Sequence, residues 1–88
     1  MKMAARVGDI NNTGGPILMG ATTVLIGGKP AAIATKMTIN NMMNGAPDPI
    51  VMGSTTVLIE NMPAVRVGDP TAGGATIAMG CPTVLIGG

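Results

Sequence analysis

The sequence predicts an all-β fold, a small three-sided domain built from three pseudo-threefold β-hairpin repeats. Glycine and proline, 14 and 7 of the 88 residues, interrupt the chain every few positions, so no stretch keeps the apolar period of a helix. One β-rich segment occurs three times along the chain. Because a single hairpin is only marginally stable in water, three hairpins are expected to share one apolar core.

The clearest repeat has the pattern Ile-x-Met-Gly-x-x-Thr-Val-Leu-Ile and occupies residues 17–26, 50–59 and 77–86. Its Ile-x-Met and Thr-Val-Leu-Ile parts are predicted strands, and the Gly-x-x between them has the length and the glycine of a hairpin turn. The methionines of this pattern recur in register, and we expect them to pack in the core around the threefold axis (Met19, Met52 and Met79). A thioether site for a soft metal such as copper(I) is the alternative use of these residues.

A second element precedes each repeat, at residues 3–9, 30–36 and 63–69. The first and third copies contain Arg-Val-Gly-Asp, in which we expect the aspartate to cap or close a turn and the arginine to satisfy a carbonyl or a neighbouring carboxylate. A ligand-binding pair is the alternative use of these residues. The middle copy lacks this sequence, and its unit is six residues longer, with the extra residues placed within Thr38 to Pro49. The chain therefore reads as one domain, 1–88, with units of about 3–29, 30–62 and 63–88.

The composition argues against an enzyme. The chain has no histidine, the commonest general acid or base, and its four carboxylates are scattered. The only cysteine, Cys81, stands where the other copies have Ala21 and Ser54, and we interpret it as a small buried residue with no cationic cluster beside it. A net charge of +1 and the absence of aromatic residues speak against nucleic-acid binding, and no motif indicates a small-molecule substrate.

The repeats resemble a known family. Met3-Ala4-Ala5-Arg6, Pro30-Ala31-Ala32-Ile33 and Pro63-Ala64-Val65-Arg66, with the following Val-Gly-Asp and Gly-x-x-Thr-Val-Leu-Ile-Gly-Gly segments, are similar to the PAAR-repeat proteins over essentially the whole chain. That resemblance implies a cone that caps and sharpens the trimeric β-helical spike of a type VI secretion system, a contractile phage tail or a related injection particle. It implies one copy per spike trimer and transient contact of the apex with a target membrane.

The resemblance also implies a location. Such a tip belongs to a virion tail or is secreted at the end of a type VI-like apparatus. The opening residues lack the apolar region of a signal peptide, and no apolar run is long enough to span a membrane, so we expect assembly in the bacterial cytoplasm without a signal peptide.

Two ends of the cone then become candidate sites. The broad base would dock on the spike through the three copies of one strand, which are Thr23, Val24, Leu25, Ile26, Thr56, Val57, Leu58, Ile59, Thr83, Val84, Leu85 and Ile86. The apex would be formed by residues of the first unit and of the insertion, namely Thr13, Asn40, Asn41, Met42 and Met43.

The family's apical metal site is not expected here. Many members close the apex with zinc or iron bound by three histidines and one cysteine, and this chain has neither ligand type at the matching positions, residues 13, 40–44 and 71–74. We therefore expect no cofactor and an apex closed by methionine packing and asparagine hydrogen bonds, with an unusual metal as the alternative. A small Met/Cys metal-binding module remains the alternative function for the whole chain.

Overall fold

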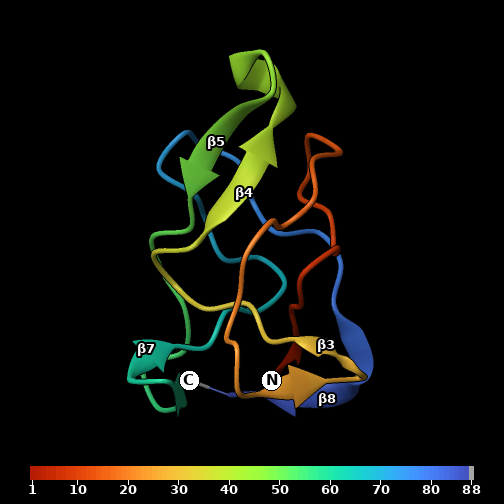
Figure 1. Cartoon of the computed structure of the whole chain (residues 1–88), viewed down its shortest axis with the longest axis vertical. Helices are drawn as coiled ribbons and strands as arrows, with labels where there is room; N and C mark the ends of the chain where they lie inside the picture. Colours follow the sequence, from red (N-terminus) through yellow and green to blue (C-terminus); the bar gives the residue numbers. More distant parts are fainter. Residues whose placement is uncertain (88) are drawn as a thin grey trace.

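The structure is a computed structural model that describes residues 1–87. It contains short antiparallel strands joined by turns, and the described residues include a single turn of 3-10 helix (Figure 1). The elements in chain order are β1 (Lys2–Ala4), β2 (Leu25–Ile26), β3 (Lys29–Pro30), β4 (Met37–Asn40), η1 (Asn41–Met43), β5 (Ala46–Pro49), β6 (Leu58–Ile59), β7 (Met62–Pro63) and β8 (Cys81–Ile86). The predicted all-β fold is confirmed.

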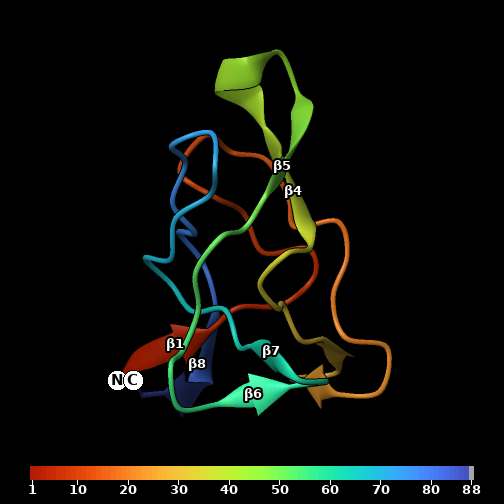
Figure 2. The same cartoon turned by 90° about the vertical axis from the view of Figure 1, so that its left-hand side faces the viewer.

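Three strand pairs lie together at one end of the molecule, which we call the base (Figures 1 and 2). They are β2–β3, β6–β7 and β1–β8, all antiparallel. The three pairs have one register, because Leu25, Leu58 and Leu85 face Pro30, Pro63 and Met3. The third pair joins the beginning of the chain to its end, so the two ends of the described chain complete the third member of the base.

The hairpin turns do not lie where the repeat pattern placed them. We predicted the turn at Gly-x-x, but the chain reverses after the Thr-Val-Leu-Ile strand, at Gly27–Gly28 and at Glu60–Asn61. All four residues have left-handed backbone angles, with φ of 58° and 81° in the first turn and 53° and 65° in the second. Two consecutive left-handed residues match the twist of a tight antiparallel hairpin.

The glycine inside the repeat pattern has a different purpose. Gly20, Gly53 and Gly80 do not have left-handed backbone angles. Each lies close to the carbonyl oxygen of an alanine in or next to a base strand, namely Ala31, Ala64 and Ala4. A Cβ on Gly53 would lie 2.6 Å from the Ala64 oxygen, and one on Gly80 would lie 2.8 Å from the Ala4 oxygen. Close packing of two backbones, rather than turn geometry, explains why this position is glycine.

A closed ring of backbone hydrogen bonds joins the three units above the base. The amide of Ala5 donates to the Val65 oxygen at 3.0 Å, that of Val65 to Ala32 at 3.0 Å, and that of Ala32 to Ala5 at 2.9 Å. The ring residues are buried and pack in one cluster with the first isoleucine of each repeat, and the full cluster is Ala5, Ile17, Ala32, Ile50, Val65 and Ile77. This ring defines the pseudo-threefold axis of the molecule.

The middle unit keeps this arrangement although its sequence has changed. Thr35 stands where the other units have Gly8 and Gly68, and all three have positive φ, 79°, 92° and 94°. Their amides donate equivalent bonds to the first isoleucine of each repeat, at 2.8, 3.0 and 2.7 Å. A β-branched residue disfavours this conformation, so the ring around it imposes the turn on Thr35.

The prediction that the three repeated methionines pack in the core is wrong. Met19, Met52 and Met79 are 52, 57 and 49% exposed. The segment that contains each of them is not a regular strand, so side chains do not alternate between two faces, and two consecutive positions turn outward. The first isoleucines and small alanines fill the axis instead, at 1% exposure or less for Ile17, Ile50 and Ile77.

The insertion of the middle unit forms a projecting hairpin. Strands β4 and β5 pair from Met37 with Pro49 to Asn40 with Ala46, and η1 closes the end. This hairpin rises opposite the base and narrows the molecule to a tip, which we call the apex (Figure 1). The molecule measures 31 × 23 × 21 Å along its principal axes. Among the described residues, no helix is long and apolar enough to cross a membrane.

Candidate functional site: the base and the apex

The strand at the base turns its leucines outward and its isoleucines inward. Leu25, Leu58 and Leu85 are 62, 60 and 51% exposed, whereas the following isoleucines are 9, 9 and 6% exposed (Ile26, Ile59 and Ile86). The isoleucines pack in a second core cluster with alanines of all three units. Of the twelve predicted docking residues, the leucines and the exposed threonines Thr23, Thr56 and Thr83 therefore face solvent, while the isoleucines support them.

The three segments that lead to these leucines are held in different ways. In the second unit, the Ser54 hydroxyl accepts hydrogen bonds from the amides of Thr56 at 3.2 Å and Val57 at 3.0 Å. In the third unit, the Cys81 thiol takes this place and lies 3.2 Å from the Thr83 hydroxyl. The first unit has Ala21, which offers no acceptor.

Glu60 supplies the missing acceptor from the neighbouring unit. Its carboxylate accepts hydrogen bonds from the Thr23 amide at 2.9 Å and from the Thr23 hydroxyl at 2.6 Å. These hydrogen bonds from Thr23 lower the pKa of Glu60. The base is therefore threefold in backbone and leucines, but it carries one acidic side chain at a single position.

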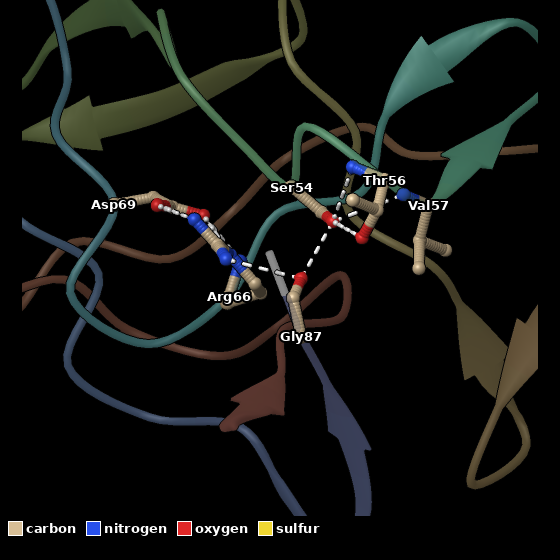
Figure 3. A network of polar contacts seen from close by, with 6 residues as sticks. All are labelled: Ser54, Thr56, Val57, Arg66, Asp69 and Gly87. Atoms are coloured by element: carbon tan, nitrogen blue, oxygen red, sulfur yellow. Dashed lines mark hydrogen bonds and ion pairs between the residues drawn. The ribbon is translucent and has the colours of Figure 1, made fainter.

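A polar network fixes the end of β8 to the body of the molecule (Figure 3). The Gly87 carbonyl accepts hydrogen bonds from the Ser54 hydroxyl at 2.6 Å and from the Arg66 guanidinium at 3.2 Å. Arg66 in turn binds Asp69 through its amide at 2.7 Å and through two guanidinium nitrogens at 3.2 and 3.0 Å. This paired, bidentate geometry confirms the structural role that we predicted for the Arg-Val-Gly-Asp sequence.

The first unit repeats this arrangement with Cys81 in the place of Ser54. Arg6 binds Asp9 at 3.0 and 3.1 Å, and a Cβ on Gly27 would meet both Arg6 Nη1 and Cys81 Sγ, which shows that the two side chains flank the same turn. Cys81 is 4% exposed, as expected for a small buried residue. The pKa of its thiol is lowered, first by hydrogen bonding with Thr83 and further by the Arg6 charge, a neighbour that the sequence did not indicate.

The predicted apical residues lie together at the end opposite the base. The backbone N–H of Asn41 donates to the Thr13 hydroxyl at 3.0 Å, and its side-chain NH₂ donates to the Thr13 carbonyl at 2.9 Å. Met42 and Met43 are 69 and 42% exposed, so thioether packing contributes little to closing the apex. Asn40 is buried and caps η1 by accepting a hydrogen bond from the Met42 amide at 2.9 Å.

Hydrogen bonds between units hold the apical hairpin in place. The buried Asn11 side chain donates to the Thr38 hydroxyl at 3.0 Å and to the Ile39 carbonyl at 2.7 Å, which ties the first unit to the hairpin. The first and third units are also joined, because the Asn12 backbone N–H donates to the Thr76 carbonyl at 2.8 Å and the Thr76 backbone N–H donates to the Asn12 side-chain oxygen at 3.0 Å. Sequence reasoning missed Asn11, although it stands at the same repeat position as Thr71.

Asp48, in β5, is the central hydrogen-bond acceptor that holds the apical hairpin to the body of the molecule. Its carboxylate is 1% exposed and accepts hydrogen bonds from Thr71 Oγ1 at 2.5 Å, Gly73 N at 2.8 Å and Asn40 Nδ2 at 2.9 Å. Burial by itself raises the pKa of Asp48, but the three hydrogen bonds outweigh it and lower the pKa below the ordinary 3.8. The carboxylate thus joins the hairpin of the second unit to a loop of the third, a role that the scattered carboxylates of the sequence did not suggest.

We expect Asp48→Asn to cost about 2 kcal/mol of unfolding free energy, because one of its donors would then face an amide NH₂ group instead of an oxygen. Since the folded pKa lies below 3.8, the contribution of Asp48 is present at neutral pH and is lost as the pH falls below that value. Far-UV circular dichroism in urea measures both effects, and the difference between wild type and variant should shrink toward pH 3. The matched control is Glu60→Gln, an exposed carboxylate whose replacement keeps an oxygen that can accept both hydrogen bonds of Thr23, so stability should change little. Equal losses in both variants would contradict this assignment.

The apical residues do not fit the zinc or iron of the resemblance. Thr13 and Asn40 already use their side-chain oxygens in hydrogen bonds within the apex, and hydroxyl and amide groups are poor ligands for these metals. Within residues 1–87 no three His, Cys, Asp or Glu side chains are grouped to hold a metal ion, and no pocket is found there.

The fold and its two ends define a class, that of a small pseudo-threefold β cone with three exposed leucines at its base and a narrow apex. Comparison with known protein families matches residues 7–79 to the family described as PAAR motif. The match covers most of the chain, and the protein belongs to the PAAR motif family. No curated protein matches the sequence.

Proposed function

We propose that the protein is a structural, non-enzymatic spike tip that caps a trimeric β-helical spike with one copy per trimer. The observation that carries this proposal is the base, where three strand pairs in one register present three exposed leucines around one axis. A partner with three identical chains can make three equivalent contacts with such a surface. Membership of the PAAR motif family supports the placement in an injection machine of the type VI or contractile-tail kind.

The mechanism would be mechanical. The spike pushes on the broad base, and the force is concentrated at the narrow apex, which makes transient contact with the target membrane. The hydrogen bonds of Asn11, Asp48 and Asn41 brace the apical hairpin against the other two units without a metal ion. No nucleic acid and no small-molecule substrate enters this mechanism. The tip would be assembled in the bacterial cytoplasm and carried outward on the spike.

The test is binding to the terminal β-helix of the trimeric spike from the same machine. Because the chain has no aromatic residue, a spike labelled with a fluorophore provides the signal. We expect saturable binding that survives moderate salt, since the contact is apolar. No binding to that spike at micromolar concentration would overturn the proposal.

A further inference from the structure

The repeated methionines need an explanation that the fold does not give. In the repeat, the first isoleucine fills the axial core, the glycine allows close backbone packing, and the last isoleucine fills the core at the base. The methionine is present in all three copies but is about half exposed in each. We call Met19, Met52 and Met79 the flank methionines.

Each flank methionine lies just above one strand pair of the base. The residue after Met19 is Gly20, which packs against the Ala31 carbonyl, and Ala31 directly follows β3. The equivalent contact in the second unit joins Gly53 to Ala64, directly after β7. Figure 2 shows the three segments, orange, green and blue, running down the body to the base. The flank methionines therefore lie on the sides of the molecule, next to the strand pairs of the base.

The chain segment around each methionine is apolar. Leu18 and Val51, the residues before Met19 and Met52, are 45 and 51% exposed, and the corresponding Ala78 is exposed as well. The repeat segments 17–26, 50–59 and 77–86 contain no charged residue. The same exposed apolar position is thus repeated in all three units.

We infer that the flank methionines are part of the spike-binding surface, so that each spike chain contacts one base leucine and reaches past the base to one flank. The inference rests on the proposed function. Symmetry supports it: a partner with one binding segment would use a single flank, whereas three equivalent flanks fit a partner with three equivalent chains. Methionine suits this contact because its flexible, polarizable side chain adapts to a partner while the residue before it changes from Leu to Val to Ala.

Methionine oxidation tests the inference directly. Dilute hydrogen peroxide converts exposed methionine to the sulfoxide, and peptide mass spectrometry gives a rate for each site. In the complex with the terminal β-helix of the spike, the flank methionines should be oxidised roughly fivefold more slowly than in the free chain, because the contact excludes solvent. Met42, at the apex and 69% exposed, is the internal reference and should keep its rate.

The outcomes separate this inference from the proposed function. A complex that forms without slowing oxidation at any flank overturns the flank contact and leaves the base contact standing, and protection of a single flank overturns the threefold arrangement. Failure to form any complex overturns both. As a second measurement, the triple variant Met19→Gln, Met52→Gln, Met79→Gln should bind the spike roughly tenfold more weakly with an unchanged unfolding midpoint, since its side chains are half exposed. Unchanged affinity would contradict the inference.

Discussion

Gly15→Ala is expected to lower the unfolding free energy by about 3 kcal/mol, a large share of the stability of a domain of this size. Gly15 is buried, and a Cβ at this position would overlap the carbonyl oxygen of Ile39 in β4. That oxygen also accepts a hydrogen bond from Asn11, so it cannot move without breaking the link between the first unit and the apical hairpin. Calorimetry or far-UV circular dichroism measures the loss.

The third unit shows that the expected loss of stability comes from contact with the apical hairpin and not from the backbone angle of Gly15. Its equivalent position holds Ala75, which is fully buried, and the amide of Thr71 bonds to its oxygen as that of Asn11 bonds to Gly15. The control is Gly87→Ala, because a Cβ on Gly87 would meet only Met1 Cγ at 4.0 Å. A loss below about 1 kcal/mol for Gly15→Ala, or an equal loss in the control, would contradict the described packing of the apical hairpin.

Replacement of any base leucine by glutamate is expected to weaken spike binding about 30-fold and to leave the fold intact. Each of Leu25, Leu58 and Leu85 is more than half exposed, so the free chain tolerates the charge, whereas a buried contact with the spike would not. The triple variant should show no binding. Titration against labelled spike gives the affinity, and circular dichroism confirms the fold.

The three single variants also test the symmetry of the base, since equivalent contacts predict losses that agree within a few fold. Ala72→Glu is the matched control, because it places the same charge on an exposed residue of a loop far from the base strands. Unchanged binding by all three leucine variants would show that the base is not part of the interface.

The repeat pattern predicted the threefold architecture well because its periodic isoleucines and its Thr-Val-Leu-Ile strands record the packing directly. The turn positions were wrong because a glycine can serve either a left-handed turn, as in Gly27, or close backbone packing, as in Gly53, and the sequence does not distinguish the two. The core prediction for the methionines failed for a related reason: strand alternation was assumed in segments that form no regular strand.

The location of the apex and its asparagine hydrogen bonds were predicted correctly, whereas the predicted methionine packing was wrong. The insertion was placed correctly, and Thr13 and Asn41 do meet there. Asp48 was missed because its three donors come from Asn40, Thr71 and Gly73, residues of two different units that only the fold brings together. Glu60 was missed in the same way, since its partner Thr23 lies 37 residues away.

The central claim is that one pseudo-threefold chain caps one threefold spike. Native mass spectrometry of the complex with the terminal β-helix of the spike measures this most directly. The account predicts a single species with one 8.7 kDa chain bound to three spike chains. A complex with three copies of this chain per spike trimer, or a spike trimer that binds none, would contradict it.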